Sequence, residues 1–212
     1  MTGKPIVAID GPAAAGKGTL ARRLAAELGL PYLDTGLLYR AAGRRVLDTG
    51  GDPADPTVAE AAARSLLPSD LNRNDLRGPL ADAAAASVAS IPAVRAALLA
   101  FQRDFAERDG AVLDGRDIGT VIFPDAVAKL FVTASLTERA RRRWQELRTA
   151  GMDAEIATVE TDMRQRDAKD AARTAAPLRP AADAYRLDTS DLDAEAAFRS
   201  AIAFVRGRIG PR

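Results

Sequence analysis

The segment GPAAAGKGT at residues 11–19 follows the apolar run PIVAID directly, and it restricts the fold of this chain more than any other feature. A strand, then G-x-x-x-x-G-K, then a helix brings together three physical requirements of an anion site. Gly11 and Gly16 allow backbone angles that other residues avoid, successive backbone N–H groups point inward, and the helix adds the positive end of its dipole. Lys17 adds a charge that can reach the outer phosphates of a nucleotide. We therefore predict that residues 11–19 bind phosphate.

The residue after Lys17 departs from the common form of this pattern, which has Ser or Thr there. Here Gly18 follows the lysine, and Thr19 keeps a hydroxyl in the first turn of the expected helix. Because glycine has no side chain, Gly18 lets phosphate or backbone approach closely. Farther along, AVLDG places Asp114 at the end of an expected strand, where a carboxylate could orient Mg²⁺ directly or through water. The alternative is that Asp114 caps the turn after that strand.

Short β-like runs that end in small or acidic residues alternate with long stretches rich in Ala, Leu, Arg and Glu. This alternation is typical of βα units around a parallel sheet, and it predicts the α/β class. Five strands fit a chain of 212 residues with 47% hydrophobic content, which can bury one sizeable core. The expected strands are residues 6–10, 32–33, 111–114, 129–133 and 185–188.

Local patterns also predict helix ends. The first helix should begin within residues 16–19 and end before Gly29, with leucines four positions apart along one face. SLTE at 135–138 predicts a capping box, in which Ser135 accepts a bond from the third backbone N–H and Glu138 reaches back.

Two regions do not resemble sheet-building units. Residues 51–79 are rich in turn residues around one short helix, and residues 139–180 are dense in arginine and poor in large apolar side chains. We interpret both as candidate mobile flaps.

Composition excludes several classes of function. Lys and Arg number 30 against 29 Asp and Glu, so the net charge of +1 gives no global reason to expect nucleic acid or membrane as a partner. The chain has no cysteine and no histidine, which removes disulfides, thiol nucleophiles, the usual zinc sites and imidazole acid–base chemistry. The first apolar run is too short for a signal peptide, so we expect a cytoplasmic protein. We also expect a monomer. The best membrane candidate, residues 83–101, is broken at Pro92 and carries Arg95, so an ordinary helix is favoured.

Six segments resemble the bacterial cytidylate kinase family in their order and over nearly the whole chain: IDGPAAAGKGTLA, YLDTGLLYR, IPAVRAALL, LDGRDIGTVIFPDA, ERARRRWQEL and RDAKDAARTAAPLRPAADAYRLDTS. The ordered set is far more specific than any one segment. The resemblance implies a P-loop kinase that transfers phosphate from ATP to CMP or dCMP with Mg²⁺ as cofactor. It implies a single domain with a core at residues 1–40, 105–138 and 181–212, an acceptor-binding region at 41–104 and a helical lid at 139–180.

The resemblance also implies roles for individual residues. The ATP-binding residues would be Gly11, Pro12, Ala13, Ala14, Ala15, Gly16, Lys17, Gly18 and Thr19. The CMP-binding residues would be Thr35, Arg40, Arg95, Arg116, Asp117, Arg166 and Asp170, with Arg40 and Arg116 on the acceptor phosphate. Lys17, Arg166 and Arg173 would be catalytic, and Asp114 would contact the metal.

Two of these roles have a physical reason. Asp117, with Arg95, would read cytosine, because a carboxylate accepts from the exocyclic amine of cytosine but would face the O4 acceptor of uracil. In the lid, the spacing i, i+4 and i+7 puts Arg166, Asp170 and Arg173 on one helical face, where the arginines can reach the transferred phosphate and Asp170 the ribose hydroxyls. The alternative is a surface helix laced with ion pairs.

The chain also departs from the family. Residues 67–79 replace the extra strands that the family usually carries, so the acceptor-binding insert is reduced, and Ala86 stands where the family often has a serine, with Ser87 adjacent. A kinase of another acceptor, such as UMP, AMP or a non-nucleotide molecule, therefore stays open. A third hypothesis is a regulatory module that binds nucleotide or RNA through ERARRR, although 5% aromatic content and a near-neutral charge argue against a nucleic-acid groove.

Overall fold

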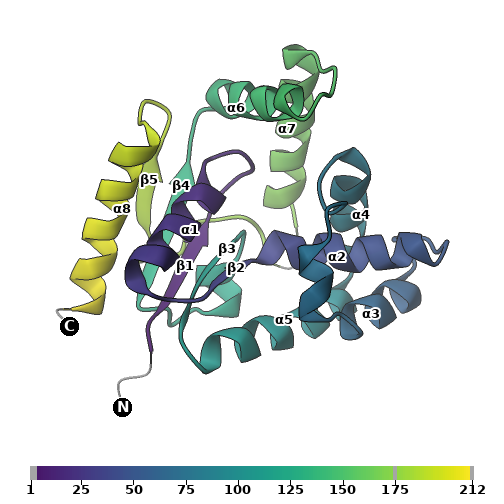
Figure 1. Cartoon of the computed structure of the whole chain (residues 1–212), viewed down its shortest axis with the longest axis horizontal. Helices are drawn as coiled ribbons and strands as arrows, with labels where there is room; N and C mark the ends of the chain where they lie inside the picture. The colour runs from purple at the N-terminus through teal and green to yellow at the C-terminus, as the bar shows by residue number, and fades with distance from the viewer. Residues whose placement is uncertain (1–3, 174–175, 211–212) are drawn as a thin grey trace. The chain divides into compact units, whose positions relative to one another are not determined.

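The computed structural model of this chain describes residues 4–173 and 176–210. Within those residues, five strands form one sheet in the order β2-β3-β1-β4-β5 (Figure 1). β1 pairs in parallel with β3 and with β4, and β4 pairs in parallel with β5. The predicted α/β class is confirmed, and each predicted strand is present with its ends within one residue of the expected positions. The strands are β1 (Ile6–Asp10), β2 (Tyr32–Asp34), β3 (Ala111–Gly115), β4 (Ala128–Thr133) and β5 (Tyr185–Asp188).

The chain divides into two compact units, one formed by the residues up to Leu33 and from Asp109 onward, the other by Asp34–Arg108. The first unit holds α1 (Lys17–Leu28), α6 (Leu136–Thr149), α7 (Ile156–Ala171), α8 (Ala194–Ile209) and the π-helical turn η2 (Ile118–Ile122). The second holds α2 (Thr35–Asp48), α3 (Pro56–Arg64), α4 (Pro79–Ala89), α5 (Pro92–Glu107) and the 3-10 helix η1 (Pro68–Asn72).

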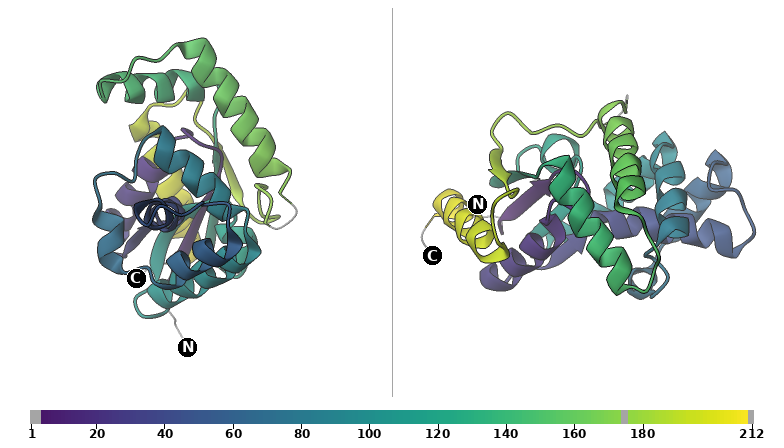
Figure 2. Two further views of the ribbon diagram at one scale, coloured as in Figure 1. Left: turned by 90° about the vertical axis from the view of Figure 1, so that its right-hand side faces the viewer. Right: turned by 90° about the horizontal axis from the view of Figure 1, so that it is seen from above.

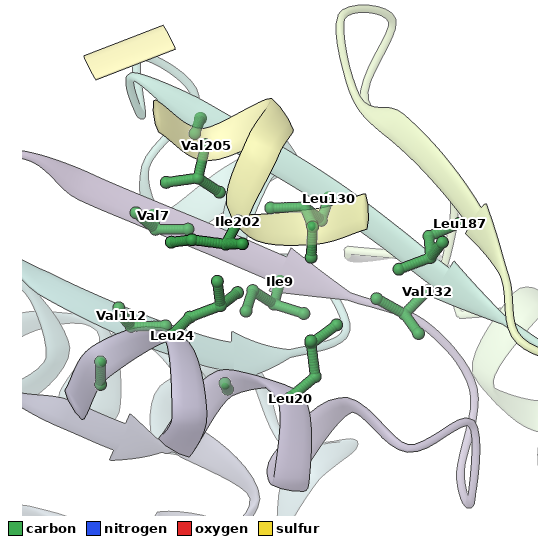
Figure 3. Close-up of a cluster of buried hydrophobic side chains, with 14 of the residues drawn as sticks. Val7, Ile9, Leu20, Leu24, Val112, Leu130, Val132, Leu187, Ile202 and Val205 are labelled. Atoms are coloured by element: carbon green, nitrogen blue, oxygen red, sulfur yellow. The ribbon is translucent and has the colours of Figure 1, made fainter. Parts of the chain in front are cut away.

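The main core of the first unit lies between one face of the sheet and helices α1 and α8 (Figure 3). Each fully buried Leu, Ile or Val side chain there stabilises the fold by about 1.5–3 kcal/mol. Because side chains alternate along a strand, Ala8 and Asp10 of β1 point to the opposite face. The side chains in this core include Val7, Ile9, Leu20, Leu24, Leu130, Val132, Leu187, Ile202 and Val205.

Helices α6 and α7 pack against each other through a small apolar cluster of their own (Figure 2). Ala140 of α6 meets Val159 and Met163 of α7, and the loop residues Ala13 and Ala14 pack against the same cluster. The arginine-rich region therefore has an apolar anchor that connects it to the segment after β1.

The capping box predicted at the start of α6 is half right. Ser135 Oγ accepts from the backbone N–H of Glu138 at 3.2 Å, as expected. The predicted second bond, from the Ser135 N–H to the Glu138 side chain, is wrong, because the Ser135 N–H donates instead to Ser190 Oγ at 2.8 Å. The Glu138 carboxylate is paired with Arg141 and Arg142 at 2.7 and 2.8 Å. Charge-assisted bonds to two arginines outcompete a bond to a neutral N–H group.

The second unit is helical, and none of its residues after Asp34 lies in a strand. Helix α2 lies close to α4 because Gly43 has no side chain: a Cβ at Gly43 would lie 2.8 Å from the Cβ of Ala84. The segment 67–79 contains η1 and no strand.

Helices α4 and α5 include the stretch with the most membrane-like composition. Of the helices in residues 4–173 and 176–210, no single one has the length and apolar character needed to cross a membrane. Helices α4 and α5 reach the required length and apolar character only when they are taken together, and the chain bends by 100° between them. The bend falls at the predicted position, next to Pro92.

Candidate active site

The loop between β1 and α1 has the backbone that phosphate binding requires. Gly11 has a φ of 148° and Gly16 a φ of 86°, and Ala14 adopts a φ of 56°, which is rare for a residue with a side chain. Gly11 also runs against β4, because a Cβ there would lie 1.9 Å from the carbonyl oxygen of Val132. The sequence therefore needs glycine at position 11 for two independent reasons.

The side chain of Lys17 is buried within this loop. Its Nζ donates to the carbonyl oxygen of Pro12 at 2.7 Å, and the residue is 6% exposed. A buried ammonium group requires partners, since its desolvation is costly. The loop thus holds a positive charge among backbone groups whose geometry favours an anion.

Gly18 lies beside Asp114, the carboxylate predicted at the end of β3. A Cβ on Gly18 would be 3.5 Å from Asp114 Oδ2 and 3.7 Å from the Tyr32 hydroxyl, which are ordinary contacts. The protein itself therefore leaves room for a side chain at position 18. Tyr32 Oη donates to Asp114 Oδ1 at 3.2 Å and orients this buried carboxylate.

Two arginines of α6 support the loop from the side. Arg139 is 5% exposed, pairs with Asp167 of α7 at 2.7 Å, and donates to the carbonyl oxygen of Ala134 at 3.0 Å. Arg142 donates to Thr189 Oγ1 and to the Thr189 carbonyl oxygen at 3.0 and 2.7 Å. The sequence could not tell which arginine of ERARRR lies beside the donor loop.

Contacts near the loop distinguish Arg139 and Arg142 from Arg143 of the same helix. A Cβ at Gly16 would lie 3.8 Å from Arg142 NH1, and Thr189 Oγ1 donates to the Ala15 carbonyl oxygen at 3.2 Å. Arg143 instead pairs with Glu146 of its own helix at 3.2 Å. Arg139 NH1 donates to the Ala13 carbonyl oxygen at 3.4 Å, so Arg139 and Arg142 both border the loop.

Three predicted residues meet in one cluster of the first unit. Arg116 Nε donates to Asp170 Oδ2 at 3.0 Å, and Arg173 NH2 contacts Asp170 Oδ1 at 2.6 Å. The Asp170 side chain is 4% exposed, so each of its oxygens is used by one arginine. The placement on one helical face holds for Arg166 and Asp170 but is wrong for Arg173, because α7 ends at Ala171. Arg173 reaches back to Asp170 from the turn that follows.

Asp117 directly precedes the π-helical turn η2 and is 6% exposed. Next to it lies a residue that the sequence reasoning missed. Asp10, at the end of β1, accepts from the backbone N–H groups of Ile118 and Gly119, each at 2.8 Å. The available signal was an acidic residue that ends an apolar strand directly before the loop.

Burial raises the pKa of Asp10 from 3.8 to about 6. The two backbone N–H groups and Lys17 act in the opposite direction, and the negative charge of Asp117 adds to the rise. Asp10 is therefore a buried carboxyl group whose charge changes just below neutral pH.

This pKa predicts a specific dependence of stability on pH. Because the folded pKa is raised, the contribution of Asp10 is fully present below pH 3.8 and is lost as the pH rises through about 6. A shift of this size corresponds to roughly 2–3 kcal/mol. We expect the free energy of unfolding of the wild type to fall relative to that of Asp10→Asn by about 2 kcal/mol between pH 4 and pH 7. Denaturant titrations at both pH values measure this difference, and a constant difference would contradict it.

The second unit carries the other predicted acceptor residues. Thr35 is buried at the start of α2. Arg40 of α2 pairs with Asp82 of α4, with NH2 and Oδ1 at 2.9 Å. The Arg95 guanidinium lies over the Tyr39 ring, 5.9 Å from its centroid. The sequence reasoning missed Asp82, since nothing in its local pattern distinguishes it from other acids on exposed helices.

The residues beside the loop suit Mg²⁺ as a partner of phosphate. Among the residues that the structure describes, no group of three or more acidic, His or Cys side chains could hold a metal ion by itself. Mg²⁺ prefers oxygen ligands and is commonly held by one or two carboxylates together with substrate phosphates. Asp114 offers such a carboxylate next to Gly18, and Thr19 adds a hydroxyl in the same turn.

A phosphate-binding loop at the first strand of a parallel sheet, with a buried lysine and the Arg116–Asp170–Arg173 cluster in the same unit, defines a P-loop kinase. The cytidylate kinase family model matches residues 7–206. The chain is 62% identical over 201 residues to the cytidylate kinase of Granulibacter bethesdensis, covering 95% of this chain and 96% of the relative. It is 61% identical over 205 residues to that of Acidiphilium cryptum, covering 97% of each. The chain therefore belongs to the cytidylate kinase family and is an enzyme of that family.

Solved structures show the same fold at low identity. A gluconokinase from Sinorhizobium meliloti matches with a TM-score of 0.51 at 14% identity, covering 98% of this chain and 94% of the other. An uncharacterized protein from Eubacterium ventriosum matches with a TM-score of 0.57, also at 14% identity, covering 97% and 100%. These likenesses concern the fold alone.

Proposed function

We propose that this enzyme transfers the γ-phosphoryl group of ATP to CMP or dCMP, giving CDP or dCDP. The observation that carries the proposal is the Arg116–Asp170–Arg173 cluster, which gathers two guanidinium groups in the same unit as the phosphate loop. Paired guanidinium groups suit an acceptor that is itself a phosphate. Such an acceptor is already an oxyanion near neutral pH and needs no dedicated general base, which agrees with the absence of histidine.

The loop residues 11–19 bind the donor in this proposal. Their backbone N–H groups and the N-terminus of α1 hold the phosphates, and Lys17 exchanges its Pro12 partner for a phosphate oxygen. Asp114 and Thr19 would hold Mg²⁺, which, when bound, neutralises charge on the phosphates. Tyr32 keeps the Asp114 carboxylate turned toward the loop.

The arginines act on the transferred group and on the acceptor phosphate. Arg116 and Arg173 leave the Asp170 oxygens for phosphate oxygens, and Asp170 is then able to accept from ribose hydroxyls. Arg166 lies on the same face of α7 as Asp170 and joins them. In-line positioning and neutralised charge are the main requirements of phosphoryl transfer, because the protein has little covalent chemistry to perform.

Acceptor recognition is assigned to four further residues. Arg40 binds the acceptor phosphate, and Thr35 contributes a hydroxyl at the start of α2. Asp117 and Arg95 read the base, with the Asp117 carboxylate accepting from the exocyclic amine that cytosine has and uracil lacks. A cytoplasmic location and a monomeric state are also proposed, from the sequence and from the nature of the substrates.

An acceptor panel tests this assignment. Purified wild-type enzyme with ATP and Mg²⁺ should phosphorylate CMP and dCMP in preference to UMP and AMP, and failure on both cytidine nucleotides would refute the proposed function. Asp117→Ala should lower kcat/KM for CMP by roughly 10- to 100-fold, the value of one hydrogen bond to a charged group, with less effect on the KM for ATP. Asp125→Ala removes an exposed carboxylate eight positions along the same segment and should leave the panel unchanged.

The RNA-binding hypothesis is less well supported. The α6 arginines that motivated it have internal partners: Arg139 pairs with Asp167, Arg141 with Glu138, and Arg142 with Glu138. A mobility shift with RNA or DNA at physiological salt, without CMP, would revive this hypothesis.

A further inference from the structure

Asp10 joins the strand that leads into the phosphate loop to the segment that carries Arg116 and Asp117. It is the last residue of β1, and its side chain points away from the core between the sheet and α1 and α8. Its Oδ1 accepts from the Ile118 N–H and its Oδ2 from the Gly119 N–H, both at 2.8 Å. These two N–H groups lie at the start of η2, where a helical turn has no internal acceptors for them.

The surroundings leave Asp10 little freedom to move. It is 4% exposed. A Cβ on Gly119 would lie 3.4 Å from Asp10 Oδ2 and 3.2 Å from Cδ of Lys129, so the turn lies directly against both side chains. The Lys129 ammonium is itself held at 2.9 Å by Asp183. The charged groups that act on Asp10 are Lys17, which stabilises its ionised form, and Asp117, which opposes it.

We propose that Asp10 is a positioning residue for acceptor recognition, which acts by fixing the peptide that follows Asp117. The two bonds join residues 108 and 109 positions apart in the chain. They set the direction in which Asp117 leaves the end of β3, and with it the angle at which its carboxylate can meet a base. This inference rests on the proposed function, in which Asp117 reads the base.

The variant Asp10→Asn separates positioning from a general contribution to stability. An amide has one acceptor oxygen and an NH₂ group, so one of the two backbone N–H groups loses its acceptor. We expect faster hydrogen exchange at the amides of Ile118 and Gly119. We also expect the CMP-over-UMP ratio of kcat/KM to fall about tenfold, in line with the loss of one buried hydrogen bond, while the Kd for ATP stays within about twofold of the wild type.

Two further variants keep the test decisive. Asp109→Asn makes the same change at an exposed carboxylate that pairs with Lys4, and it should match the wild type in every measurement. If Asp10→Asn does not fold, Gly119→Ala strains the same contact from the other side, through a Cβ placed against Asp10 and Lys129, and should erode the CMP-over-UMP ratio in the same direction.

The outcomes are distinct. An unchanged CMP-over-UMP ratio overturns the proposal, whether or not hydrogen exchange at Ile118 and Gly119 is faster. A loss of ATP affinity as large as the loss of acceptor discrimination also overturns it, because Asp10 would then act through the phosphate loop. If the wild type does not phosphorylate CMP at all, the proposed function fails. Because this result needs no Asp10 variant, it is distinguishable from a failure of the Asp10 proposal.

Discussion

Lys17→Met should lower kcat by about 10²–10³-fold, the usual cost of removing one charged or hydrogen-bonding group that stabilises the transition state. The Lys17 ammonium is buried inside the loop and bonded to the Pro12 carbonyl, and residues 11–19 contain no other charged side chain that could replace it. Methionine keeps most of the aliphatic length and removes the ammonium group with its charge and its N–H donors. Steady-state kinetics at saturating ATP and CMP measure this loss.

The matched control for this change is Lys4→Met, which removes a lysine that is exposed and pairs with Asp109 at the surface. Its kcat should equal that of the wild type. If Lys17→Met kept kcat within threefold of the wild type, the assignment of the loop as the donor site would be wrong.

Gly11→Ala should destabilise the fold by at least about 3 kcal/mol, because it combines backbone strain with overpacking. The added Cβ would lie 1.9 Å from the carbonyl oxygen of Val132, which belongs to a central strand and cannot withdraw without breaking the sheet. Denaturant or thermal unfolding measures the loss, and ATP binding should disappear with it.

Gly29→Ala separates the two contributions. Gly29 ends α1 with a φ of 63°, and a Cβ there would meet nothing within 4 Å. Only the strain of the left-handed backbone remains, and we expect a loss of about 1–2 kcal/mol. Equal losses in the two variants would show that the contact with Val132 is less restrictive than its geometry implies.

The features predicted from the sequence depend on local signals. The strand, loop and helix at residues 6–28 were found because glycine, lysine and apolar residues fall at positions that the backbone itself requires. The sheet followed from the alternation of β-like and helix-like stretches, since each stretch reports its own periodicity.

Most of the features that the sequence did not reveal depend on partners far apart in the chain, and one depends on a choice between local partners. Asp10 and Ile118 are 108 positions apart, and Arg116 and Asp170 are 54 apart, so no spacing pattern connects them. Glu138 had a good local partner, the backbone at Ser135, but bonds two arginines on its own helix instead. With 30 basic and 29 acidic side chains, many pairings are compatible with the sequence, and only the packed fold selects among them.

In the proposed function, the Arg116–Asp170–Arg173 cluster also bears on which anions the enzyme can retain. An anion that approaches these guanidinium groups must displace a carboxylate that already holds them at 3.0 and 2.6 Å. Asp170 therefore acts as a tethered competitor, whose local concentration does not change when solution anions come and go. We therefore expect inorganic phosphate and sulfate, which have no further attachment to the protein, to compete poorly against it. A nucleotide whose base and sugar are also bound should outcompete it, and the buried Asp170 carboxylate would then favour nucleotides over free inorganic anions of similar charge.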